Sequence, residues 1–167
     1  MHVGHLYFAS IIACTALADA RAATAGGTVT STATVLPICR ALTIAPLAFG
    51  EYQPAGNDSV ATASISVQCS ASTPVSVSLD RGTTAGSSIS ARRLADGRGN
   101  TLDYQLYTSV TRSTVWGDGT AGSATVVASG LGLASTMQFV VHGVIPAGQS
   151  TAVPGQYTDS ITITLTY

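Results

Sequence analysis

The sequence predicts an all-β sandwich, and three observations carry this prediction. Apolar and polar residues alternate with a period of two over many short segments, as they do along strands that bury one face. After the first 22 residues, no segment shows the 3.6-residue spacing of an amphipathic helix. Ser and Thr make up about a quarter of the chain, and together with many Val residues they favour strands. We expect a β-sandwich of seven or so strands, spaced roughly 8–12 residues apart.

The first 22 residues have the pattern of a cleaved secretory signal peptide. Leu6–Ala18 is an apolar run too short to span a bilayer, and small residues follow at Ala18–Ala20 and Ala20–Ala22, either of which fits an A-x-A cleavage site. Ile11–Cys14 offers a lipoprotein-type alternative, in which Cys14 would carry the lipid. We therefore expect an exported chain with residues 1–22 removed, an extension over 23–37 and one domain over 38–167.

The extension contains a strand pattern with two distinct faces. Its even positions are Thr28, Thr30, Thr32 and Thr34, and its odd positions are Val29, Ser31, Ala33 and Val35. Such alternation predicts an extended strand with a narrow apolar face of small side chains. Pro37, which cannot donate to a ladder, interrupts it. This strand either pairs within its own domain or is offered to a neighbouring chain.

Two cysteines remain after the signal peptide, Cys39 and Cys69. In an exported chain such a pair is expected to form a disulfide, and no further ligands lie nearby at the spacing of a metal site. The closed loop of about 30 residues would stabilise the fold by roughly 3–4 kcal/mol. Cys69 shares a face with Ile65 and Val67, so the bond is expected in the core, where it ties the first fixed strand to the second.

The remaining strands follow in order along the chain. Ser59–Ser70 and Val75–Leu79 alternate and are separated by a turn, so we expect them to form a hairpin. Arg81–Asn100 is expected to be a long surface connection with one short strand, in which Arg92–Arg93 forms a solvated pair. Further strands are predicted at Leu102–Tyr107, Ala124–Ala128 and Met137–Ile145, with a tight turn at Trp116–Thr120.

The final strand pattern, Tyr157–Tyr167, reaches the last residue of the sequence. It directs Ile161, Ile163, Leu165 and Tyr167 inward and Thr162, Thr164 and Thr166 outward.

The chain lacks the residue groups that catalysis or nucleic-acid binding would need. Its seven Arg, absence of Lys and net charge of −1 provide no basic face, so no nucleic-acid partner is expected. His142 is the one histidine after the signal peptide, and we expect it to be a partly exposed strand residue. Most of the carboxylates lie beside Gly, Asn or Ser in turn contexts, which favours backbone roles. We expect no enzyme, cofactor or metal site; Trp116 and the tyrosines are either core anchors or a sugar-binding platform.

Several segments in fixed order resemble one family. They are Cys39, Phe49–Tyr52, Cys69–Ser70, Pro74–Val77, Arg93–Leu94, Leu102–Tyr107, Trp116–Thr120, Gly143–Gln149 and Pro154–Ile161. Together they resemble the spore coat protein U domain, the subunit family of archaic chaperone–usher pili. The resemblance covers about Thr28–Tyr167.

The resemblance implies an immunoglobulin-like sandwich that lacks its final strand and is completed by donor-strand complementation. The acceptor groove would be bordered by Ile161, Ile163, Leu165 and Tyr167, and the donor residues would be Val29, Ser31, Ala33 and Val35. Implied partners are a periplasmic chaperone, an outer-membrane usher and further pilin subunits in a surface fibre that supports adhesion and biofilm formation. Two alternatives are a carbohydrate-binding or tip adhesin domain, with Trp116, Tyr104 and Tyr107 contacting ligand, and a structural protein of a spore coat.

Overall fold

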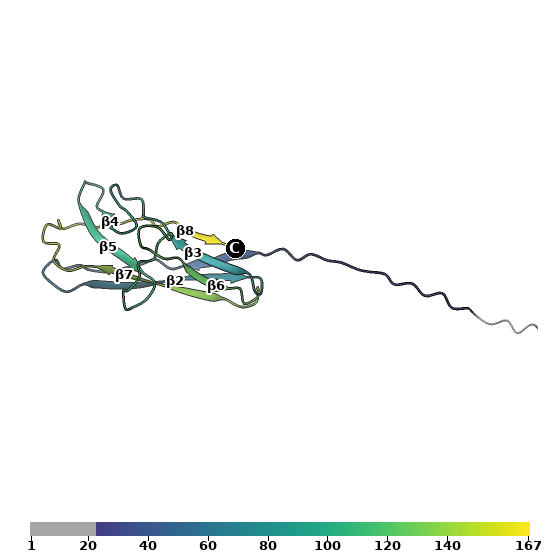
Figure 1. Ribbon diagram of the computed structural model, residues 1–167. Helices are drawn as coiled ribbons and strands as arrows, with labels where there is room; N and C mark the ends of the chain where they lie inside the picture. Colours follow the sequence, from purple (N-terminus) through teal and green to yellow (C-terminus); the bar gives the residue numbers. More distant parts are fainter. Residues whose placement is uncertain (1–22) are drawn as a thin grey trace, which may run out of the picture. The chain divides into compact units, whose positions relative to one another are not determined.

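The computed structural model describes residues 23–167, in which there are eight strands and no helix (Figure 1). The strands are β1 (Cys39–Ile44), β2 (Ser59–Cys69), β3 (Pro74–Leu79), β4 (Arg92–Ala95), β5 (Thr101–Tyr107), β6 (Val126–Ser129), β7 (Met137–Ile145) and β8 (Ile163–Thr166). The chain divides into two units, residues 1–34 and 35–167, and all eight strands belong to the second. Over the described range no helix is long and apolar enough to cross a membrane.

The second unit is a sandwich of two antiparallel sheets. One sheet has the strand order β1-β2-β7-β5-β4 and the other the order β6-β3-β8. Their inner faces supply a shared core because alternate residues of each strand point inward. The strand residues of this core are Ile65, Val67, Cys69, Val75, Val77, Leu79, Leu102, Tyr104, Leu106, Met137, Phe139, Val141 and Ile145, and Trp116 joins them from a connection. The predicted all-β sandwich is confirmed, with eight strands.

The predicted hairpin between Ser59–Ser70 and Val75–Leu79 is wrong. β2 pairs with β1 and β7, whereas β3 pairs with β6 and β8, so the two strands lie in different sheets. The connection crosses the sandwich through Ser72, which has a φ of 60° and whose amide donates to the Gly130 carbonyl at 2.8 Å. Alternation shows which residues of each strand are buried. It does not distinguish strands that lie side by side from strands that face each other across a core.

The prediction that Arg92–Arg93 is a solvated loop pair is also wrong. Both residues lie in β4, and Arg92 is 0% exposed. Its guanidinium donates to the carbonyl oxygens of Asp80 at 2.7 Å and Trp116 at 2.9 Å, and to Gln105 Oε1 at 2.6 Å. A buried guanidinium is tolerated when its donors are satisfied, and here they bind Gln105 of β5, the residue after β3 and the connection that holds Trp116. Arg93 is partly exposed and pairs with Asp103 at 3.2 Å.

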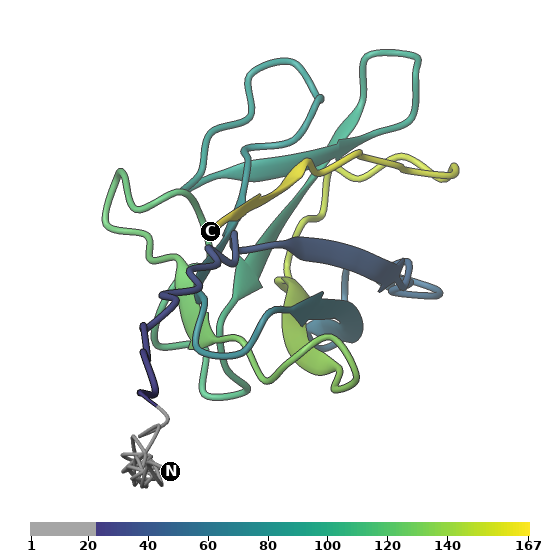
Figure 2. The same ribbon diagram turned by 90° about the vertical axis from the view of Figure 1, so that its right-hand side faces the viewer.

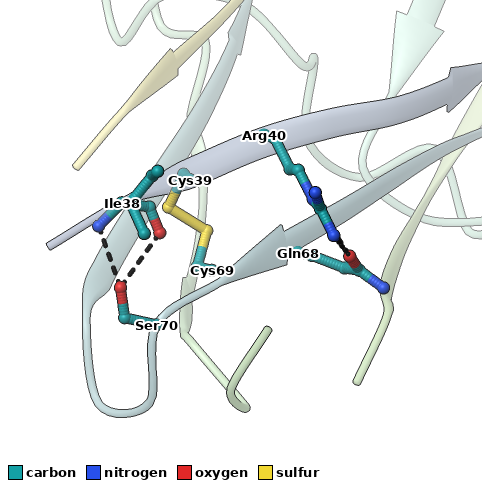
Figure 3. The surroundings of a disulfide bond; sticks show 6 residues. All are labelled: Ile38, Cys39, Arg40, Gln68, Cys69 and Ser70. Carbon is teal, nitrogen blue, oxygen red and sulfur yellow. Dashed lines mark hydrogen bonds between the residues drawn. A yellow bond between two sulfur atoms is a disulfide. The ribbon is translucent and has the colours of Figure 1, made fainter. Parts of the chain in front are cut away.

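The predicted disulfide is confirmed. Cys39 and Cys69 are bonded, and they are directly opposite each other in the β1–β2 register (Figure 3). Cys69 is 0% exposed, so the bond reaches the core as expected. Beside it, Ser70 Oγ accepts from the Ile38 amide at 2.9 Å and donates to the Ile38 carbonyl at 3.1 Å. The start of β1 is therefore tied to the end of β2.

The strand pattern over Thr28–Val35 does not pair within the described part of its own chain. Residues 23–38 carry no strand, and every side chain from 23 to 34 is exposed; Val29 is 93% exposed. A strand is defined by ladder hydrogen bonds, and this segment has no ladder partner in the described part of the chain. The predicted signal peptide, with Cys14, lies outside the described residues.

The last strand is shorter than predicted. β8 covers Ile163–Thr166, and Ile161, Ile163 and Leu165 pack against the core while the alternating threonines are exposed. Tyr167 is 55% exposed, so its predicted inward position is wrong. It follows Thr166, the last residue of β8 that pairs with β3, and no ladder fixes its direction.

Candidate functional site: an apolar trough between two sheet edges

Two adjoining cavities form a hollow in the second unit. The first has a volume of about 290 Å³ and the second about 930 Å³. They share four lining residues, Leu47, Phe49, Leu94 and Asp159. We call the combined hollow the trough. Residues 44–54 form its N-terminal rim and residues 152–163 its C-terminal rim.

The smaller cavity has a buried apolar floor and partly open rims. Its floor includes Ile65, Leu79, Leu106 and Val141, which are all buried. On the rims Ile44 is 55% exposed, and Leu47, Phe49, Ile161 and Ile163 are partly buried. An apolar floor that opens to solvent between half-buried rims is a groove suited to apolar side chains from outside the domain.

Both rims adjoin a strand with a free edge. β1 pairs with β2 alone and β8 with β3 alone among the described strands, so each leaves one row of backbone groups without a ladder partner. Figure 2 shows β1, in blue, and β8, in yellow, at neighbouring edges of the two sheets, and Ile44 and Ile163 line the same cavity. Unpaired strand edges are templates for a further strand.

The N-terminal rim is seated over a glycine of β7. A Cβ atom at Gly143 would lie 2.5 Å from Leu47 Cδ2 and 2.8 Å from Phe49 Cζ, so both side chains occupy the space that a larger residue would need. The Phe49 ring also meets Tyr104 edge to face at 6.1 Å between centroids. Residues 45–50 of this rim make few hydrogen bonds: the Ala45 amide donates to the Ser64 carbonyl at 3.0 Å, and Ser59 Oγ donates to the Phe49 carbonyl at 3.1 Å. Tyr52 and Pro54, at the end of the rim, are hydrogen-bonded to the segment after β7.

The C-terminal rim is held by two carboxylates. Asp159 Oδ1 accepts from the amides of Thr83 at 2.9 Å and Thr84 at 3.0 Å and from both of their hydroxyls, while Oδ2 accepts from the Tyr104 hydroxyl at 2.7 Å. A Cβ atom at Gly82, whose φ is +89°, would overlap the Asp159 carboxylate, so this contact also depends on a glycine. The second carboxylate, Asp80, accepts from the amides of Thr162 and Gly82, each at 2.9 Å.

The same rim is also tied to the other sheet. Thr158 and Ala95 exchange backbone hydrogen bonds at 2.9 Å in each direction, which joins the segment before β8 to β4. Together with the carboxylate contacts, these bonds fix the C-terminal rim at Thr158, Asp159 and Thr162.

The electrostatics of this cluster follow from burial and hydrogen bonding. Desolvation alone would raise the pKa of Asp80, but the bonds from Thr162 and Gly82 outweigh it, and the pKa lies below its ordinary value. Burial, aided by the bond to Asp159, raises the pKa of Tyr104, which therefore stays a neutral donor. Desolvation lowers the pKa of Arg92. The hydrogen-bond donors and acceptors of this cluster therefore pair with one another, and their role is structural.

The structure brings together only some of the residues named from the sequence. Ile161 and Ile163 line the smaller cavity, Leu165 packs on the core, and Tyr167 is exposed outside the lining. Trp116 and Tyr104 are 1% and 5% exposed, so neither side chain can serve as a surface platform for a sugar. His142 is partly exposed on β7, as predicted. Within residues 23–167 no three His, Cys, Asp or Glu side chains converge as metal ligands would.

Several residues that shape the trough were not predicted as site residues from the sequence, among them Leu47, Phe49 and Asp159 in its lining and Gly143 beneath its N-terminal rim. The alternating apolar residues between Ala45 and Phe49 gave a usable signal for the N-terminal rim. Gly143 stands in an otherwise apolar strand pattern, where a glycine often marks close approach of another group. Nothing in the local sequence indicates that Asp159 reaches residues 75 and 76 positions away.

A solved structure shares this fold. It is a chain from the crystal structure of the CsuC–CsuE chaperone–tip adhesion subunit pre-assembly complex of archaic chaperone-usher Csu pili of Acinetobacter baumannii. The TM-score is 0.51 and the identity 18%, over 80% of this chain and 40% of that chain. The fold therefore places the protein among immunoglobulin-like β-sandwich domains.

Sequence comparison identifies the family. The model of the Spore Coat Protein U domain matches residues 25–164. "Protein U" of Myxococcus xanthus is 36% identical over 133 residues, which cover 72% of this chain and 71% of that protein. The chain belongs to the Spore Coat Protein U domain family, as its motifs predicted.

Proposed function

We propose that this protein is a structural subunit of an archaic chaperone–usher pilus that assembles by donor-strand exchange. The observation that carries the proposal is the smaller cavity of the trough, an apolar groove bordered by two strand edges that are free among the described strands. A strand laid between β1 and β8 would satisfy both edges and cover the apolar floor, as in recognition by strand addition.

The occupant that fits is the N-terminal extension of a second copy or of a related subunit. Thr28–Val35 has strand periodicity but no ladder within the described chain, and Val29 and Val35 are 93% and 87% exposed. At ~3.3 Å per residue, this segment would extend about 26 Å. Val29, Ser31, Ala33 and Val35 would face the floor, and the four threonines would face solvent.

The proposed contact explains assembly into a fibre. Each subunit would donate one segment and receive another through a different surface, so the contact is heterologous and does not close. A free trough is an aggregation hazard, which gives a periplasmic chaperone and an outer-membrane usher their roles before and during assembly. The product would be a surface fibre supporting adhesion and biofilm formation, and the subunit's role would be structural rather than enzymatic.

The first test removes the proposed donor. A chain lacking Thr24–Leu36 is co-expressed with its chaperone in an exporting host. We expect the chaperone still to co-purify, because the trough is intact, and denaturant-resistant, heat-sensitive multimers to disappear. Multimers that persist unchanged would overturn the proposal.

A matched pair of point variants tests which face of the donor strand enters the trough. Ala33→Asn puts an amide on the face proposed to enter the trough, whereas Thr32→Asn puts the same group on the solvent face. We expect the first to reduce multimers at least tenfold and the second to leave them within twofold, because burying an unpaired amide is costly. Equal effects of the two variants would contradict the proposed strand facing. Independently, we expect genes for a chaperone and an usher to lie beside the gene of this protein.

A further inference from the structure

We propose that Gly143 is a specificity-determining residue of the trough, because it sets how deeply Leu47 and Phe49 sit and hence how large a donor side chain fits. The inference deepens the proposed function and rests on it. It names the class of strand that the trough accepts: one whose inward side chains are no larger than Val.

The geometry at Gly143 leaves no spare room. Gly143 is buried and belongs to the inner face of β7, between Val141 and Ile145. Its backbone has no left-handed φ, so an alanine is compatible with the strand itself. A methyl group there would nevertheless lie 2.5 Å from Leu47 Cδ2 and 2.8 Å from Phe49 Cζ, against ordinary carbon contacts of about 3.5–4.0 Å. Both rim side chains would have to move by roughly 1 Å.

The displaced side chains would move toward free space. The core around Phe139 is closely packed, and such interiors have little free volume. The free space beside Leu47 and Phe49 is the trough, because both residues line both of its cavities. A residue larger than glycine at position 143 therefore makes the trough shallower.

The volume indicates what the trough takes in its present form. A cavity of about 150 Å³ holds one benzene-sized group. The apolar cavity of about 290 Å³ thus holds two groups of that size or several small side chains. The extension offers Val, Ser, Ala and Val at its odd positions, and no residue between Thr28 and Val35 is larger than Val or Thr. The four inward side chains of the extension are therefore small enough to share the cavity that glycine at position 143 leaves open.

The test measures peptide binding to the mature full chain. All chains carry Ala33→Asn, which removes self-donation, and the probe is a labelled peptide of residues 23–37 with the natural sequence, followed by fluorescence anisotropy. We expect Gly143→Ala to weaken binding at least tenfold. Adding Leu47→Ala, which removes the atom closest to the new methyl group, should restore binding to within threefold of the Gly143 chain. His142→Ala, at the adjacent outward-facing position of β7, is the matched control and should change binding less than twofold.

A second measurement does not depend on the folding of Gly143→Ala. Four peptides carry Leu in turn at positions 29, 31, 33 and 35. The Gly143 chain should bind each of them at least fivefold more weakly than the natural peptide, whereas the Leu47→Ala chain should recover at least one of them to within twofold.

Four outcomes would overturn the inference. If the Gly143 chain binds no peptide, both the inference and the donor-strand proposal fail. If that chain binds but Gly143→Ala binds equally well, or if all Leu peptides bind as well as the natural one, the inference alone fails. A loss in Gly143→Ala that Leu47→Ala does not relieve would show general destabilisation instead.

Discussion

The N-terminal rim of the trough rests on apolar side chains, whereas the C-terminal rim is fixed by hydrogen bonds. Leu47 and Phe49 pack over Gly143 with few polar contacts, and the opposite rim is anchored at Asp159, at Thr162 and at Thr158. Each rim needs a glycine to let its anchor approach, Gly143 on one side and Gly82 on the other.

The difference separates two tasks that an acceptor groove must perform. Hydrogen bonds form only within a narrow range of distance and angle. The C-terminal rim therefore holds β8 in one defined position and register. Apolar packing is non-directional and adjusts by small shifts, so the N-terminal rim can adapt to the side chains that enter. We expect perturbation of the C-terminal rim to cost stability and perturbation of the N-terminal rim to change selectivity.

The largest effect is expected from Asp159→Ala. The substitution removes the acceptor for five donors, including the hydroxyl of Tyr104, which is 5% exposed. Leaving buried donors unsatisfied costs about 1–3 kcal/mol each, less where water can enter, so we expect the free energy of unfolding to fall by about 3 kcal/mol. Urea denaturation of the purified chain measures it.

Asp118→Ala is the matched control for this variant. Asp118 accepts from the amide and hydroxyl of Thr120 in an exposed turn away from the trough. Its loss should cost less than 1 kcal/mol, because water replaces the lost contacts. If the two variants are equally stable, the C-terminal rim is not held by Asp159.

The sequence predicted the layers of this fold better than their connections. Period-two patterns located most strands, and two cysteines at strand positions predicted the bond between β1 and β2. Alternation could not assign β2 and β3 to different sheets, because both bury one face in either arrangement. Arg92 was misplaced because most of its acceptors are backbone carbonyls, which every residue carries, so no side-chain pattern marks them.

The candidate site was predictable to a similar extent. Ile161 and Ile163 follow from the alternation of the last strand pattern and do line the trough. The opposite rim and the depth at Gly143 arise from contacts between segments about 95 residues apart, Leu47 and Phe49 with β7. Local periodicity does not report contacts between distant segments, so the position of the N-terminal rim of the trough could be identified only from the structure.

A smaller effect, visible only in acid, is expected from Asp80→Asn. The pKa of Asp80 lies below its ordinary value of 3.8 in the folded chain. The ionised carboxylate therefore stabilises the fold at pH values above the pKa that Asp80 has in the unfolded chain. This contribution is lost as the pH falls through the folded pKa. Wild type should therefore be more stable than Asp80→Asn at pH 7, and the difference between the two should shrink as the pH falls through 3.8 and vanish only below the folded pKa.

Thermal unfolding from pH 7 downward measures this decrease. Asp103→Asn, which removes the same charge from an exposed position on β5, controls for net charge. Stability curves of wild type and Asp80→Asn that stay parallel down to pH 3 would show that the Asp80 charge does not hold the C-terminal rim.

The smallest effect on stability is expected when one tyrosine on each rim is replaced by phenylalanine, and the two variants should differ. Tyr52 OH donates to the Pro146 carbonyl at 2.9 Å and accepts from the Gln149 amide at 3.2 Å, which ties the N-terminal rim to the segment after β7. Tyr157 OH donates to the carbonyl of Val153, four residues away on its own rim, at 2.7 Å. Tyr52→Phe breaks two long-range bonds and should cost about 1 kcal/mol, whereas Tyr157→Phe breaks one local bond and should cost about half as much.

Hydrogen exchange distinguishes the two tyrosine variants further than their stabilities do. Because the N-terminal rim has few other polar contacts, Tyr52→Phe should speed exchange of the Gln149 amide and leave amides of the C-terminal rim unchanged. Tyr157→Phe should leave the Thr158 amide protected, since its bond to the Ala95 carbonyl remains. Faster exchange of the Thr158 amide in Tyr52→Phe would show that the rims open together, and the division between an adaptable and a fixed rim would then be wrong.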